Sequence, residues 1–137
     1  YFRTMANHCS LSPRQLRTWY FEQYLPLMVS VIGKHFKTVE WLSSFVSECR
    51  KRNVKLVVLS DYGHTHEKLH ALGIDEKLFD WVISAPELGG LKPAAQLITQ
   101  VAAHFSVPAE HCLVIGDRED TDGELARAVG ARFCLTK

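Results

Sequence analysis

The spacing of apolar residues divides the chain into a helical beginning and an alternating remainder. Residues 12–33 follow a helical period, which Pro26 is expected to kink or split because proline has no backbone N–H to donate. Residues 38–52 are predicted to form a second, clearly amphipathic helix. Its apolar face consists of Trp41, Leu42, Phe45, Val46 and Cys49.

Beyond residue 54, short apolar runs alternate with helical patterns. The predicted strands cover residues 55–60, 81–84, 113–116 and 132–135. The predicted helices cover residues 65–72, a segment that begins at Pro93, and residues 122–129. Strands that alternate with helices predict an α/β fold, in which a parallel sheet carries helices on both faces.

Composition narrows the possible functions. The chain of 137 residues is long enough for one domain with a real core, and its net charge of +1 does not suggest a nucleic-acid partner. No apolar run approaches the roughly 18 residues that a membrane span needs, so no membrane is expected as a partner. The four cysteines lack metal-site spacing, which favours a reducing, cytoplasmic setting.

Groups suited to phosphate chemistry follow the predicted strands. Ser60 ends the first strand and Asp61 follows it, Lys92 comes just before a predicted helix start, and acids begin at Asp117 after the third strand. Ligands of open α/β sheets bind just beyond the carboxyl ends of the strands. A hydroxyl and a lysine suit a phosphate, and carboxylates suit a hard cation such as Mg²⁺.

Each of these groups also has a simpler interpretation. Ser60 can cap the next helix, and Lys92 can be a solvated loop lysine. The acids can be a helix start that the helix dipole favours, although this explains Asp117, directly on the strand end, poorly. A bound cation would relieve the repulsion between these closely spaced carboxylates. The acidic cluster comprises Asp117, Glu119, Asp120 and Asp122.

A different metal motif occurs in the predicted helix 65–72. His66, Glu67 and His70 spell H-E-x-x-H, the pattern of zinc proteases, and His64 lies nearby. Catalytic zinc usually needs three protein ligands, and no third ligand follows from a known pattern here. We therefore expect a solvated helix face that binds no metal.

Taken in order, these residues resemble three motifs of the haloacid dehalogenase-like (HAD) hydrolase superfamily. Residues 56–61 (LVVLSD) resemble the second motif, with its phosphate-binding hydroxyl at Ser60. Residues 90–93 (GLKP) resemble the third, with its phosphate-binding lysine at Lys92. Residues 114–117 (VIGD) resemble the fourth, metal-holding motif, with Asp122 five residues after Asp117. Residues 68–74 and 78–80 are similar to the subgroup with a helical cap.

The resemblance implies a three-layer, doubly wound parallel sheet of the HAD/Rossmann-like kind. Residues 1–35 would be the C-terminal part of a helical cap, and residues 36–137 the α/β core. The first motif of the superfamily, Asp-x-Asp-x-Thr on the central strand, has no counterpart, since the first aspartate of the sequence is Asp61. We expect the missing strand to come from an upstream segment of the same protein or from a second chain, and this chain alone to be inactive.

The implied function is a Mg²⁺-dependent phosphohydrolase for a small phosphorylated metabolite, acting through an aspartyl-phosphate on the missing strand. Ser60, Asp61 and Lys92 would bind the phosphate, and Asp117 and Asp122 the metal. One alternative is dehalogenation of a 2-haloacid, which needs no metal and leaves the acidic cluster unexplained. Another is an inactive module that binds a phosphorylated ligand or a protein, which the missing first motif supports.

Overall fold

The computed structural model describes residues 2–136, which form two compact units. The first unit consists of the residues up to 54 together with residues 64–79. The second consists of residues 55–63 and of the chain from residue 80 onward. In the described part of the chain, no helix is both long and apolar enough to cross a membrane.

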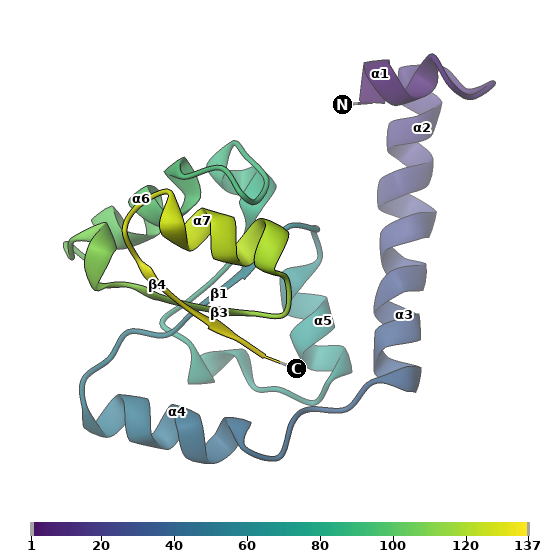
Figure 1. Cartoon of the computed structure of the whole chain (residues 1–137). Helices are drawn as coiled ribbons and strands as arrows, with labels where there is room; N and C mark the ends of the chain where they lie inside the picture. The colour runs from purple at the N-terminus through teal and green to yellow at the C-terminus, as the bar shows by residue number, and fades with distance from the viewer. Residues whose placement is uncertain (1, 137) are drawn as a thin grey trace. The chain divides into compact units, whose positions relative to one another are not determined.

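The first unit is helical. Its first three helices follow one another along the chain, and the third contacts the last (Figure 1). The helices are α1 (Phe2–Ala6), α2 (Pro13–Trp19), α3 (Leu25–His35), α4 (Leu42–Lys51) and α5 (Thr65–Ala71).

The helical run around Pro26 continues where a kink or a split was expected. A π-helical turn, Tyr20–Tyr24, joins α2 to α3, and the N–H of Leu25 donates to the carbonyl of Tyr20. Pro26 then lies in the first turn of α3, where its missing N–H does little harm. The prediction of a kink was therefore wrong, because the wider turn accommodates the proline without breaking the helix (Figure 1).

Two parallel strand pairs form the sheets of the second unit. Strand β1 (Val57–Ser60) pairs with β2 (Trp81–Ser84), and β3 (Leu113–Gly116) pairs with β4 (Arg132–Leu135). The expected α/β class with parallel strands is confirmed, and the predicted ranges of β2, β3 and β4 match. The strand predicted over 55–60 begins two residues later, at Val57.

The two pairs are separate within residues 2–136, so β1 and β3 do not hydrogen-bond to each other there. The sequence predicts that β1 and β3 are not hydrogen-bonded to each other, because a missing strand is expected to lie between them. That a further strand lies between them remains a prediction, as does the predicted division into cap and core at residue 35.

The core of the second unit lies between the strands and α6 (Gln96–His104) and α7 (Glu124–Arg127). Leu97 and Leu125 are fully buried there, and Val114 of β3 packs against them. The other face of β3 is open, since Leu113 and Ile115 are 49% and 39% exposed. The sequence predicts a sheet with helices on both faces, but within the described chain this face of β3 is not covered.

Three predicted helix starts are displaced. The helix predicted from residue 38 begins at Leu42. Pro93 does not begin a helix: the N–H of Ala94 donates to the carbonyl of Leu91 at 2.9 Å in a turn, and α6 begins at Gln96. The helix starts only after this turn. Similarly, the helix predicted from residue 122 begins with a π-helical turn, Glu119–Gly123, before α7.

Candidate active site

Lys92 is held by two carboxylates from different parts of the second unit. Its Nζ donates to Oδ1 of Asp122 at 2.7 Å, and its backbone N–H donates to Oδ1 of Asp61 at 2.8 Å. The side chains of Lys92 and Asp122 are only 16% and 7% exposed. The structure therefore brings together three of the predicted site residues, which follow β1, precede α6 and follow β3.

Local structure explains where Lys92 lies. After β2, a short 3₁₀ turn (Ala85–Leu88) ends at Gly89, whose φ of +78° is a conformation that glycine adopts without strain. The chain then turns through Lys92 before α6 begins. A solvated loop lysine, the simpler interpretation from the sequence, does not describe this buried and paired side chain.

The carboxylate of Asp122 lies against the backbone at the end of β3. A Cβ added to Gly116 would lie 2.7 Å from the Cβ of Asp122 and closer still to its carboxyl group. The N–H of Asp122 donates to the carbonyl of Arg118 at 2.8 Å, which curls the loop back onto the strand end. Glycine at position 116 is thus what allows Asp122 to reach Lys92.

Ser60 ends β1 as predicted and is half-buried. Its Oγ accepts a long hydrogen bond of 3.4 Å from the N–H of Tyr62. The residue before α5 is His64, so Ser60 is not the cap of that helix. The helix-cap interpretation of Ser60 is therefore excluded.

The acids after β3 are mostly neutralised by basic side chains. Arg118 binds Asp120 through two hydrogen bonds of 3.1 and 2.6 Å, and Nη1 of Arg127 lies 2.5 Å from Oε1 of Glu119. The hydrogen bonding raises the pKa of the Arg118 guanidinium and lowers the pKa of the Asp120 carboxyl. Mutual repulsion among the acids is thus relieved within the chain and does not by itself require a metal.

Asp117 differs from its acidic neighbours. It lies exposed directly after β3, and within residues 2–136 it is not paired with a basic side chain. The same described residues contain no group of three or more His, Cys, Asp or Glu side chains placed to hold a metal ion. That Asp117 and Asp122 hold a metal at this edge stays a prediction.

The H-E-x-x-H motif lies on α5, in the first unit, and its side chains have acidic or basic neighbours there. Nδ1 of His66 is 2.6 Å from Oε2 of Glu76, and Nδ1 of His64 is 3.5 Å from Oε1 of Glu67. His70 is exposed. The expectation that this motif binds no metal stays a prediction.

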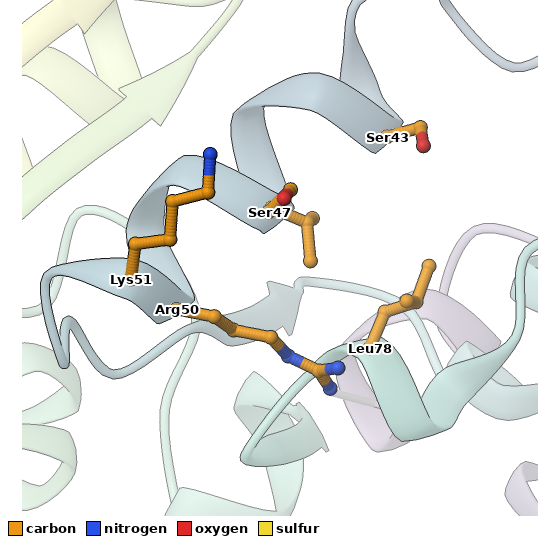
Figure 2. A pocket seen from close by; sticks show the side chains of 6 residues that line it. Ser43, Ser47, Arg50, Lys51 and Leu78 are labelled. Atoms are coloured by element: carbon orange, nitrogen blue, oxygen red, sulfur yellow. The ribbon is translucent and has the colours of Figure 1, made fainter.

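A pocket of about 380 Å³ lies in the first unit, beside α4 (Figure 2). One of its residues, Arg50, donates from Nη2 to the carbonyl of Lys77 at 2.6 Å. None of the predicted site residues lines this pocket. Its lining consists of Ser43, Val46, Ser47, Arg50, Lys51 and Leu78.

Sequence reasoning missed two features of the site. The sequence places Asp61 among the phosphate-binding residues but gives no role to its carboxylate, which accepts the N–H of Lys92. It also gave no role to Gly116, although that glycine makes room for Asp122. An acid directly after Ser60, and a glycine directly before Asp117, were the available signals.

Comparison with known proteins supports the family resemblance. Residues 19–130 match the family of haloacid dehalogenase-like hydrolases. The chain is 34% identical to Protein SUPPRESSOR OF QUENCHING 1, chloroplastic, of Arabidopsis thaliana. The match extends over 74 residues, which are 53% of this chain and 7% of that protein. Over 42 residues, 31% of the chain, it is 48% identical to a probable D-glycero-D-manno-heptose-1,7-bisphosphate 7-phosphatase of Thermoplasma acidophilum, and covers 26% of it.

Solved structures share the fold. The crystal structure of β-phosphoglucomutase from Clostridium difficile superimposes with a TM-score of 0.72 at 19% identity, over 90% of this chain and 55% of that one. The chain thus spans little more than half of that protein and about a quarter or less of the two sequence relatives.

Proposed function

The chain belongs to the haloacid dehalogenase-like hydrolases, and we propose that it forms most of the core of a Mg²⁺-dependent phosphohydrolase for a small phosphorylated metabolite. The observation that carries the proposal is the buried ion pair of Lys92 and Asp122, 2.7 Å apart. A buried ion pair contributes little net stability compared with apolar residues of similar size. Its presence beyond the strand ends is therefore better explained by binding of an anion than by folding.

The phosphate would lie against Ser60 and Lys92. The hydroxyl of Ser60 and the backbone N–H of Asp61 donate to phosphoryl oxygens, and the ammonium of Lys92 neutralises charge that grows in the transition state. Because this charge is buried, it acts in a medium that screens it less than water does. The Thermoplasma relative is named as a phosphatase of a heptose bisphosphate, which supports a phosphorylated sugar or a similarly small substrate.

Asp117 and Asp122 would form the metal site. Mg²⁺ commonly binds through one or two carboxylates and takes its other oxygens from substrate phosphate and water, which suits Asp117 and Asp122. Asp117 would bind directly, and Asp122, already bonded to Lys92, would contribute through water or by orienting its neighbours. When bound, the ion neutralises the phosphoryl oxygens.

The nucleophile in this proposal is an aspartate outside residues 1–137. A strand between β1 and β3 would bring such a residue to the edge where Ser60 and Asp117 lie, since the carboxyl ends of parallel strands share one edge. The aspartate would attack phosphorus and form an aspartyl-phosphate. The strand comes from an upstream segment of the same polypeptide or from a second chain, and residues 1–137 alone are inactive.

A cytoplasmic location completes the proposal. It rests on the four cysteines, none of which forms a disulfide.

The test is turnover by the intact protein, that is, this chain together with the strand that completes its sheet. Small phosphate monoesters are supplied with Mg²⁺ and, separately, with a chelator. Phosphate release that depends on Mg²⁺ supports the proposal. Halide release from a 2-haloacid without metal would identify a dehalogenase, and phosphate binding without turnover would identify a binding module.

A further inference from the structure

Lys92 is attached at two points to two different strand ends. The carboxylate of Asp61, directly after β1, accepts its backbone N–H at 2.8 Å across 31 residues of sequence. The carboxylate of Asp122, in the loop after β3, accepts its Nζ at 2.7 Å. Both contacts are partly shielded from water, and both lie within the second unit.

The two contacts restrict different parts of the lysine. The backbone bond to Asp61 fixes the turn that carries the Cα of Lys92, and the ion pair with Asp122 fixes the ammonium at the other end. A lysine side chain has four carbons of flexible stem, so one attachment alone leaves the ammonium free to sample several positions. The hydrogen bond that Asp61 accepts from the backbone N–H of Lys92 therefore decides where the side chain starts.

We infer that Asp61 is a positioning residue, which acts on the reacting phosphate by holding the Lys92 turn through its carboxylate oxygen. The inference rests on the proposed function of the same site and deepens it. Asp61 contributes an acceptor atom here, and its negative charge is not what the site requires. An error of about 1 Å in the placement of a catalytic group can cost roughly 100-fold in rate, so loss of this one acceptor would be seen in turnover.

Two substitutions separate the acceptor from the charge. In Asp61→Asn the amide oxygen still accepts the Lys92 N–H, but the charge is gone, whereas Asp61→Ala removes both. In the intact protein, we expect Asp61→Ala to lower kcat about 10- to 100-fold with little change in KM, because Lys92 acts mainly in the transition state. Asp61→Asn should retain kcat within about threefold of the wild type.

Asp80 supplies a matched control at the opposite end of β1. Its Oδ2 accepts the backbone N–H of Leu56 at 2.9 Å, the same kind of contact, and its Oδ1 is 3.0 Å from Nζ of Lys55. Asp80→Ala should lower the thermal midpoint and leave kcat unchanged. A loss of kcat common to Asp61→Ala and Asp80→Ala would indicate a general effect on the fold and overturn the inference.

Other outcomes are equally decisive. If Asp61→Asn is as slow as Asp61→Ala, the charge of Asp61 matters, and the residue acts as a base or a metal ligand. If both variants keep full activity, Asp61 does not position Lys92. Should Asp61→Ala not fold, a large loss of kcat in Asp61→Asn alone would still overturn the inference.

A measurement that needs no turnover separates this inference from the proposed function. The amide of Lys92 should be protected from hydrogen exchange in the wild type and in Asp61→Asn, and should lose protection in Asp61→Ala. Equal protection in all three proteins would overturn the positioning role. If the wild type turns over no phosphate ester while the exchange pattern holds, the proposed function fails and the contact between Asp61 and Lys92 stands.

Discussion

The ammonium of Lys92 lies 2.7 Å from Oδ1 of Asp122, although 30 residues separate the two in the sequence. The side chains of the pair are largely shielded from water. Either charge without the other would be a buried and uncompensated ion, so the two residues depend on each other for stability as well as for their placement.

Substitution of Lys92 should reduce activity far more than substitution of Ser60. Lys92→Ala removes a full charge from a shielded site and is expected to lower kcat/KM by at least about 1,000-fold in the intact protein. Ser60→Ala removes one neutral hydrogen-bond donor and should lower kcat/KM by about 10- to 100-fold. Steady-state kinetics with a phosphate monoester measure both. Equal losses in the two variants would contradict a charge-based role for Lys92.

The same ion pair predicts a stability effect. Asp122→Ala leaves the Lys92 ammonium buried without its partner and should lower the free energy of unfolding by about 3–5 kcal/mol. Urea denaturation measures this. Asp120→Ala is the control, since its pair with Arg118 is exposed and its loss should leave the urea midpoint unchanged. A wild-type midpoint for Asp122→Ala would show that the pair is not buried in solution.

Gly116→Ala should displace Asp122. The added methyl group would collide with the Asp122 side chain, so we expect a loss of about 1–3 kcal/mol in unfolding free energy together with reduced activity. Gly123→Ala is the comparison, because its new methyl would meet only the flexible end of the Glu119 side chain at 3.0 Å. The idea fails if both alanine variants behave alike.

Asp117→Asn should abolish Mg²⁺-dependent turnover and leave the fold intact. Asp117 is exposed and unpaired with any base among the described residues, so its substitution should change the unfolding free energy by less than about 0.5 kcal/mol. Activity titrated against Mg²⁺, together with urea denaturation, separates the two effects. Full activity at limiting Mg²⁺ would remove Asp117 from the metal site.

The separated strand pairs predict the behaviour of residues 1–137 alone. Strand spacing is about 4.8 Å, so a missing strand implies that β1 and β3 lie roughly 9–10 Å apart and that each keeps an open edge. We expect this chain alone to associate, or to bind a hydrophobic dye as a loosely packed state, in sedimentation and fluorescence measurements. A cooperatively folding monomer with β1 and β3 directly paired would show that no strand is missing.

The ranges of β2, β3 and β4 are predictable from the sequence, because they follow from local spacing. Short apolar runs between turns specify strands, and an apolar residue every three or four positions specifies a helix face. Gly73, with a φ of +69°, likewise ends α5 where the pattern predicts. The order of Ser60, Lys92 and Asp117 along the chain was enough to indicate the family.

The contacts of the site were decided by the tertiary structure. That Asp61 and Asp122 both hold Lys92 depends on how β1 and the loop after β3 approach the turn before α6, and no local pattern encodes distances across 30 residues. The exposure of Leu113 and Ile115 is also a tertiary result, since an apolar strand has the same sequence whether one of its faces is covered or both. The spacing of apolar residues specifies helices and strands, because these depend on residues that are close in the sequence. The charged side chains of Lys92 and Asp122 become partners only when the folded chain brings the two loops together.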